Sequence, residues 1–138
     1  MVVKILLDSN IIIMATKGLI TYSMFEEVIE QKIEFITTSA VIDELERLSN
    51  EGPRSLSRVI KFSFNLIKKL NVKVLQSEVK GADDSIFYLA IQLKNSGDDV
   101  YVATCDRVLR RRLRSVGIPS IYYRESKAGL EAEWYSRI

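Results

Sequence analysis

Five acidic residues lie where an apolar segment ends or begins. Asp8 directly follows the apolar run VVKILL, and Asp106 follows VYVATC. Asp83 and Asp84 open one helical pattern, and Glu44 lies early in another. Carboxylates brought close together raise each other's pKa, and a divalent cation removes that conflict. Oxygen ligands suit hard cations such as Mg²⁺ and Mn²⁺, so a metal site built from these acids is a reasonable hypothesis.

The rest of the composition restricts the chemistry to such groups. The chain has no histidine, which removes the usual general base and the imidazole ligands of zinc, copper and iron. It has one cysteine, Cys105, so an internal disulfide and a thiolate zinc cage are both excluded. A catalyst made from this sequence must use carboxylates, hydroxyls, lysines, arginines and a metal that carboxylates can hold.

Each acid also has a purely structural interpretation. Asp106 is a natural N-cap for the helix that follows it. Asp83 and Asp84 suit the positive end of a helix dipole. Glu46, on the same helix as Glu44, can pair with a basic residue one turn away. Taken singly, these interpretations describe the more common outcome, whereas the acids taken together favour a metal site. Spacing alone leaves both open.

A basic helix follows Asp106 at once. In the segment RVLRRRLRSV, Leu109, Leu113 and Val116 form the apolar stripe of a helix over 107–116. A neighbouring face then carries Arg107, Arg110, Arg111 and Arg114. Such a face is usually solvated surface. Beside a candidate metal ligand it also fits binding of a phosphate backbone, because arginine makes bidentate contacts with phosphate.

Apolar strands alternate with amphipathic helices along the whole chain. The patterns predict strands over 2–7, 34–38, 72–75, 100–104 and 118–123, and helices over 11–15, 23–31, 41–48, 57–70, 82–94 and 107–116. The tail from Gly129 fits a short helix. This alternation predicts an α/β three-layer sandwich with a mostly parallel sheet of four or five strands. Ligands bind such sheets at the carboxyl ends of the strands, where Asp8 and Asp106 fall.

Length and charge limit the remaining classes. The 138 residues suit one domain, and a net charge of +2 means that any attraction for nucleic acid comes from local patches. No apolar run is long enough to span a bilayer. The first residues lack a signal-peptide pattern, because Lys4 and Asp8 interrupt the apolar run. We therefore expect a cytoplasmic location.

Four motifs in order resemble the PIN domain family of metal-dependent ribonucleases. They are LLDSN, TTSAVIDELERL, GADDSIFYLA and VYVATCDRVLRRRL, followed by the closing strand GIPSIYYRE. Each motif alone is weak, and their order and spacing carry the resemblance. It covers about residues 3–123, so we expect one PIN-like nuclease domain over 1–138 with a tail over 124–138. The family is related to flap endonucleases.

The resemblance implies endonucleolytic cleavage of single-stranded RNA with Mg²⁺ or Mn²⁺, with water as nucleophile and a 5′-phosphate product. It implies a metal-binding and catalytic set of Asp8, Glu44, Asp83 and Asp106. Asp84 would be a secondary ligand, and Asn10 and Thr104 would orient ligands or water. At about 100° per residue, Asp83 lies roughly 35° from the centre of its helix's buried side, whereas Asp84 lies roughly 135° away. A helix that starts later would make this geometry irrelevant.

Partners and competing functions follow from the same comparison. The doubled acid, GIPSIYY and the arginine-rich helix look more like the branch that processes ribosomal RNA than the toxin branch. Relatives often dimerise, so we expect a homodimer. The sequence leaves open whether there is also a different protein partner. One alternative is a non-catalytic module that binds RNA or a partner. Another is a doubly wound phosphohydrolase or phosphoacceptor domain, which typically needs an acid where Asn10 stands.

Overall fold

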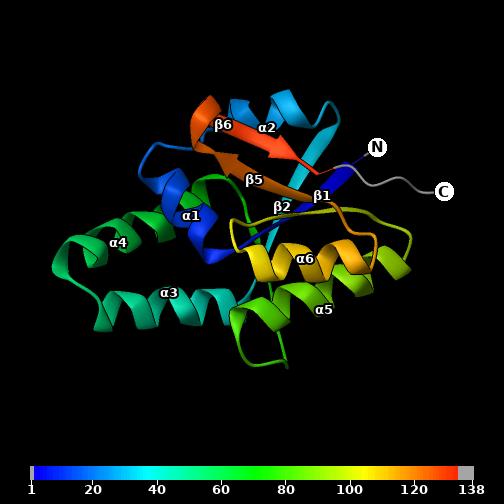
Figure 1. Cartoon of the computed structure of the whole chain (residues 1–138). Coiled ribbons are helices and arrows are strands. Elements are labelled where there is room, and N and C mark those ends of the chain that lie inside the picture. The colour runs from blue at the N-terminus through cyan, green and yellow to red at the C-terminus, as the bar shows by residue number, and fades with distance from the viewer. Residues whose placement is uncertain (1, 134–138) are drawn as a thin grey trace.

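The computed structural model describes residues 2–133, which form one mixed sheet with helices packed around it (Figure 1). The strands are β1 (Val2–Leu7), β2 (Lys32–Thr38), β3 (Lys73–Leu75), β4 (Asp99–Ala103), β5 (Ser120–Arg124) and β6 (Gly129–Ala132). Their order in the sheet is β3-β2-β1-β4-β5-β6. The first five are parallel to their neighbours, and β6 is antiparallel to β5. The predicted α/β sandwich with a mostly parallel sheet is confirmed.

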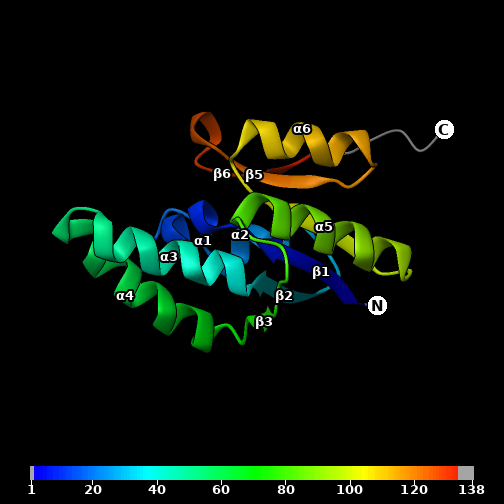
Figure 2. The ribbon, with the colours of Figure 1, turned by 90° about the horizontal axis from the view of Figure 1, so that it is seen from below.

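The helices are α1 (Ser9–Thr16), α2 (Tyr22–Val28), α3 (Ser39–Glu51), α4 (Arg54–Lys69), α5 (Ala82–Asn95) and α6 (Arg107–Ser115). Helices α3 and α4 form an antiparallel pair that extends away from the sheet, whereas α5 and α6 lie side by side (Figures 1 and 2). In the described part of the chain, no helix is long and apolar enough to cross a membrane.

Strand β1 lies near the middle of the sheet, between β2 and β4. Ile5 and Leu6 are fully buried, as expected for a parallel strand covered on both faces. Ile5 is in register with Phe35 of β2 and Tyr101 of β4. The chain moves from β1 to β2 and β3, and then returns to β4 on the other side. The carboxyl end of β1 is therefore a topological switch point, the place where such sheets bind ligands.

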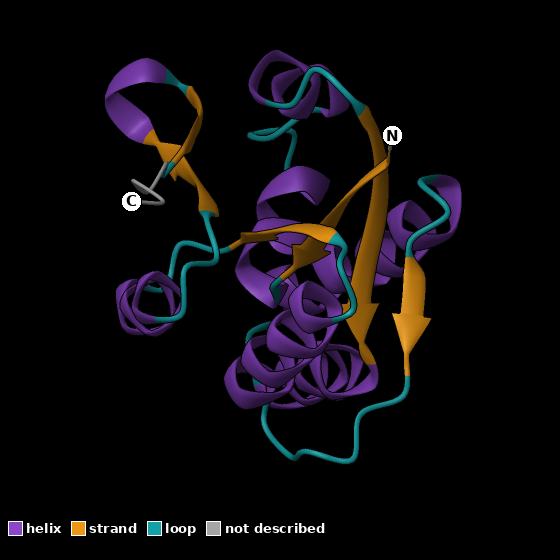
Figure 3. Cartoon of the chain, turned by 90° about the vertical axis from the view of Figure 1, so that its right-hand side faces the viewer, coloured by secondary structure: helices purple, strands orange, loops and turns teal. Residues whose placement is uncertain are grey.

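The C-terminal segment differs from the prediction. A short helix from Gly129 is wrong, because residues Gly129–Ala132 form β6, the sixth strand. The 3-10 helix η1 (Glu125–Lys127) and left-handed Ala128 reverse the chain and bring this segment against the edge of β5 (Figure 3). Pairing with an open sheet edge satisfies its backbone groups, which outweighs a weak local helical tendency. The rest of the predicted tail, 134–138, lies outside the described residues.

Candidate functional site

Asp8 is the most buried acid of the predicted set, with an exposed fraction of 2%. It follows β1 directly and caps the N-terminus of α1, where its carboxylate accepts the N–H of Ser9 at 2.8 Å. The hydroxyl of Thr104 donates to the other oxygen, Oδ2, at 2.7 Å. The side-chain amide of Asn10 points at the same oxygen from 3.4 Å. A buried carboxylate with several donors is held in one orientation.

Asn10 and Thr104 join the ends of the two neighbouring strands. The Asn10 side-chain oxygen accepts the N–H of Cys105 at 3.2 Å. The Thr104 hydroxyl accepts the N–H of Asp106 at 3.1 Å while it donates to Asp8. Both side chains therefore fix the position of Asp8 relative to the segment that carries Asp106.

Asp106 is the N-cap of α6. One of its oxygens, Oδ1, accepts the N–H groups of Val108 and Leu109 at 2.8 and 3.1 Å. The structural interpretation of this acid is therefore correct for that oxygen. The same carboxylate also raises the pKa of Asp83, so it lies near a second acid of the set. Capping and membership of a site are compatible here.

Glu44 reaches the site from α3, and its carboxylate accepts a hydrogen bond from the hydroxyl of Ser9. Burial is the main cause that raises the pKa of Asp8 to about 6. Hydrogen bonds from Thr104 and Ser9 partly oppose this shift, and the charges of Asp83 and Glu44 add to it. The surroundings of Asp8 therefore favour the protonated form of its carboxyl group over the ionised form.

Asp83 lies in the first turn of α5 and faces the same carboxylates. Although its side chain reaches solvent, partial burial raises its pKa, and the charges of Asp106 and Glu44 raise it further. The nearby Arg112 guanidinium opposes the shift. We call Asp8, Glu44, Asp83 and Asp106 the acid cluster, because their carboxylates interact electrostatically with one another.

Two hydroxyls hold the helices that carry Glu44 and Asp83. The hydroxyl of Thr38, which caps α3, is 2.7 Å from that of Ser85 in α5, and both side chains are buried. Ser85 in turn donates to the carbonyl of Ala82 at 2.8 Å. Sequence reasoning missed this link. A threonine immediately before a helix signals a cap, but the pattern does not reveal which other helix it contacts.

Asp84 points elsewhere. Helix α5 begins at Ala82, so both acids of the doubled pair are helical and a later helix start is ruled out. Asp84 is exposed, as the helical wheel predicts, and it also forms an ion pair with Arg112 of α6 at 2.8 Å. Its partner is therefore an arginine that lies outside the predicted basic face.

The predicted face of four arginines is divided in two. Arg110 and Arg114 both form ion pairs with Glu133, and the Arg110 guanidinium lies 3.7 Å from the ring centroid of Tyr122. Arg107 and Arg111 are exposed, and no ion pair within residues 2–133 involves them. The division arises because β6, which the sequence pattern did not predict, leads directly into Glu133.

The acid cluster is not a closed ligand set. Across residues 2–133, no three Asp, Glu or Cys side chains are already grouped as ligands of one metal ion. The carboxylates interact through their charges without converging on one point. Mg²⁺ suits such an arrangement, because it usually keeps several waters, which can bridge to carboxylates that do not contact the ion directly.

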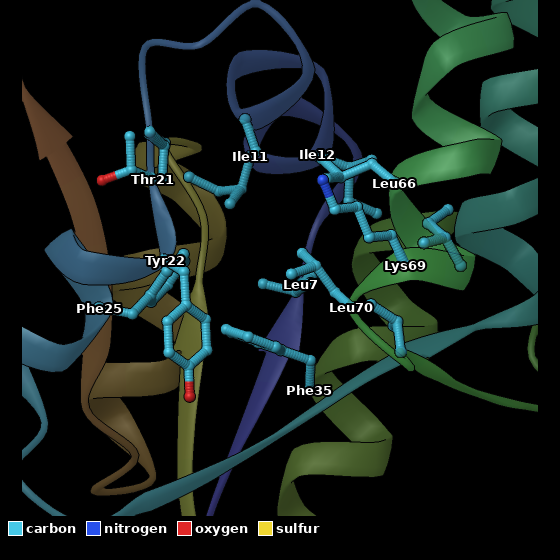
Figure 4. A pocket seen from close by; sticks show the side chains of 14 residues that line it. Leu7, Ile11, Ile12, Thr21, Tyr22, Phe25, Phe35, Leu66, Lys69 and Leu70 are labelled. Atoms are coloured by element: carbon cyan, nitrogen blue, oxygen red, sulfur yellow. The ribbon is translucent and has the colours of Figure 1, made fainter.

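A large cavity is lined by none of the residues of the acid cluster. It has a volume of about 280 Å³ and is lined mainly by apolar side chains of β1, β2, α1, α2 and α4, including Leu7, Ile12 and Phe35 (Figure 4). No acidic side chain lines it. We therefore do not assign the acid cluster's chemistry to this cavity.

The fold and the acid cluster define a class of protein: an α/β domain with interacting carboxylates at the switch point of a parallel sheet. A family described as "PIN like domain" matches residues 5–126, so the chain belongs to the PIN-like domain family. Ribonuclease VapC4 of Methanocaldococcus jannaschii is 29% identical over 125 residues, which are 90% of this chain and 92% of that protein.

Two solved structures share the fold. The PIN domain endonuclease Utp24 superposes with a TM-score of 0.74 at 22% identity, covering 98% of this chain and 94% of that chain. A domain of a functionally unknown protein from Methanocaldococcus jannaschii has a TM-score of 0.54 at 16% identity, covering 98% and 96%. These similarities confirm the fold. The roles of individual residues rest on the geometry of this chain.

Proposed function

We propose that this protein is a metal-dependent endoribonuclease that cleaves single-stranded RNA at the acid cluster. The observation that carries the proposal is the environment of Asp8, whose pKa is raised to about 6 by burial and by two neighbouring acids. The negative charges of such neighbouring carboxylates repel one another, and a bound cation removes this repulsion. Membership of the PIN-like family and the curated ribonuclease relative support hydrolysis of RNA as its use.

Asp8, Glu44, Asp83 and Asp106 would hold Mg²⁺ or Mn²⁺. The donor set fits, because it offers only carboxylate oxygens and hard divalent cations prefer these. When bound, such an ion polarises a phosphate and lowers the pKa of a water. The neighbouring polar groups have simpler tasks: Thr104 and Asn10 orient Asp8, and Ser9 orients Glu44.

Substrate would be held by Arg107 and Arg111, the two arginines of the predicted basic face that form no ion pair within residues 2–133. Arg107 and Arg111 are one helical turn apart on α6, which begins one residue after Asp106. Their charges are well placed to contact consecutive phosphates of a strand that passes the acid cluster. Arg110 and Arg114, tied to Glu133, would contribute mainly to the structure.

The test is incubation of the protein with end-labelled single-stranded RNA and Mn²⁺, with EDTA in a parallel sample. We expect fragments with 5′-phosphates that disappear with EDTA and in Asp8→Asn. Asp43→Asn, an exposed acid on the same helix as Glu44, is the matched control and should cut normally. Wild-type protein that binds RNA and never cuts it would instead favour a non-catalytic binding module. A stable acyl-phosphate on Asp8 would favour a phosphoacceptor domain.

A homodimer and a cytoplasmic location are also part of the proposal. The resemblance to the ribonuclease family motivates both. Size-exclusion chromatography with light scattering tests the oligomeric state directly. The cellular RNAs that carry new 5′-phosphate ends would show whether the protein belongs with the branch that processes ribosomal RNA or with the toxin branch.

A further inference from the structure

The outer surface of α5 and α6 carries an arrangement that the acid cluster does not use. The Arg112 guanidinium lies 4.2 Å from the ring centroid of Phe87 and forms an ion pair with Asp84. The ring of Tyr88 packs edge-on against Phe87, with centroids 5.4 Å apart. Tyr88 nevertheless remains 52% exposed. We call Phe87, Tyr88 and Arg112 the aromatic platform.

The position of this platform relative to the acid cluster is informative. Helix α5 begins with the turn that contains Asp83, and α6 is capped by Asp106, so both helices start at the acid cluster. They then lie side by side (Figure 2). Tyr88 is five residues beyond Asp83, about 8 Å along the helix axis, and one turn beyond Asp84, so it lies on the side of α5 that pairs with Arg112. A strand that leaves the acid cluster and passes over this side of α5 brings a base a few nucleotides further along to the ring.

The chemistry of the surface favours a nucleobase over other occupants. The contact of Phe87 with Arg112 and the ion pair to Asp84 hold the guanidinium flat and in place. Exposed aromatic rings and arginine planes are the groups on which single-stranded bases stack. Arg111 of α6 is exposed and can supply positive charge for the RNA backbone. The combination of a rigid ring system with adjacent cations matches a base on one side and a phosphate on the other.

A folding role explains the platform less well. A ring needed for the core is buried, whereas half of the Tyr88 surface contacts solvent. Val108, on the same side of α6 as Arg112, is 62% exposed. Both helices that begin at the acid cluster therefore carry an exposed apolar side chain near Arg112.

We propose that the aromatic platform is a base-stacking subsite for single-stranded RNA, occupied by a base a few nucleotides from the scissile phosphate. This inference rests on the proposed function and adds a substrate contact to it. Stacking requires a π-face and no particular hydrogen-bond pattern, so the subsite accepts any base and discriminates against paired strands. It would account for a preference for single-stranded over double-stranded RNA.

The test measures binding and cleavage separately. Fluorescent single-stranded RNA is titrated in EDTA, with RNA integrity checked on a gel, against wild type, Tyr88→Ala and Tyr88→Phe. We expect Tyr88→Ala to raise Kd about tenfold, within the range that loss of one stacked base produces. Tyr88→Phe should bind within about twofold of wild type. Phe62→Ala removes a ring on α4 that is 64% exposed, more than Tyr88, and is the matched control, which should leave Kd unchanged.

A second measurement isolates stacking from general damage. RNA with abasic positions should bind wild type and Tyr88→Ala with equal affinity, since no base remains to lose. The salt dependence of Kd should be the same for wild type and Tyr88→Ala, because stacking releases no counterions. A Kd unchanged by Tyr88→Ala overturns the subsite, as does an effect that persists on abasic RNA. If wild type cleaves RNA and Tyr88→Ala binds it normally, the subsite is rejected and the nuclease proposal is kept. Absence of both binding and cleavage in wild type would remove the nuclease proposal and the subsite with it.

Discussion

The Thr104 hydroxyl donates to Oδ2 of Asp8 over 2.7 Å and accepts the backbone N–H of Asp106 over 3.1 Å. One buried side chain therefore connects the two acids that end neighbouring strands. Because the hydroxyl proton is committed to Asp8, the contact favours the ionised form of that carboxylate. This is one of the two hydrogen bonds that oppose the upward shift of its pKa.

Thr104→Val keeps the shape of the side chain and removes both contacts. We expect the free energy of unfolding at pH 7 to fall by about 1–3 kcal/mol, the usual cost of leaving a buried polar group without its partner. The pKa of Asp8 should rise further. Urea denaturation measures the first effect. Thr104→Ser retains the hydroxyl and should restore most of the stability, and a Ser variant as unstable as the Val variant would contradict this role.

The pKa of Asp8 makes the stability of the metal-free protein depend on pH. The carboxyl has a pKa of about 6 when folded and 3.8 as a free reference. Between these values the folded state binds more protons than the unfolded state, so this group's stabilising contribution is lost as pH rises from about 4 to about 6. The loss is about 3 kcal/mol at most, from about 1.4 kcal/mol per pKa unit.

Asp8→Asn does not titrate, so the difference in stability between it and wild type isolates this effect. In EDTA, that difference should shift in favour of the variant as pH increases from 4 to 7. Asp43→Asn, exposed on α3, should track wild type throughout. Adding Mg²⁺ at pH 7 should raise the Tm of wild type more than that of Asp8→Asn. Parallel curves for wild type and Asp8→Asn across the whole range would show that Asp8 is not held at a raised pKa.

The two acids at the start of α5 should separate in a cleavage assay. Asp83 interacts with Asp106 and Glu44, whereas Asp84 pairs with Arg112. We expect Asp83→Asn to lose cleavage by at least about two orders of magnitude, as loss of one electrostatic group in an active site does. Asp84→Asn should keep most of its activity. If Asp84→Asn is the inactive variant and Asp83→Asn cuts normally, the third member of the acid cluster has been misassigned by one residue.

The sequence predicted the centre of the sheet well because β1 and β4 are strongly apolar and each leads to an acid, Asp8 or Asp106. Asp8 and Asp106 had to meet once β1 and β4 were neighbours, and parallel strands place their carboxyl ends on one edge. The wheel geometry of α5 separated Asp83 from Asp84 for the same kind of local reason. Contacts between segments distant in sequence could not be predicted in this way. Ser9 and Glu44 are 35 positions apart, and Thr38 and Ser85 are 47 positions apart.

The largest error follows from one missed strand. Residues Gly129–Ala132 have little strand pattern of their own and become β6 because β5 offers an open edge. That pairing places Glu133 beside α6, where it engages Arg110 and Arg114. A helical wheel drawn for α6 alone cannot reveal this partner, so it assigned all four arginines to one solvent-facing surface.

The division of the basic face gives the final prediction. Arg107 and Arg111 are exposed and unpaired within residues 2–133, whereas Arg110 is mostly buried between Glu133 and Tyr122. Replacing both Arg107 and Arg111 by alanine should weaken RNA binding similarly for all sequences. The dependence of log Kd on log salt should become shallower by about 1.4, since single strands contribute about 0.7 per lost phosphate contact. The free energy of unfolding of this double variant should change little.

Arg110→Ala should instead lower the free energy of unfolding by about 1–3 kcal/mol, because it leaves Glu133 without one partner. The salt dependence of its Kd should match that of wild type. Fluorescence titrations at four salt concentrations, with urea denaturation of the same samples, measure both quantities. An unchanged slope for the double variant would make Arg107 and Arg111 ordinary solvated surface, and a shallower slope for Arg110→Ala would return that residue to the RNA-binding face.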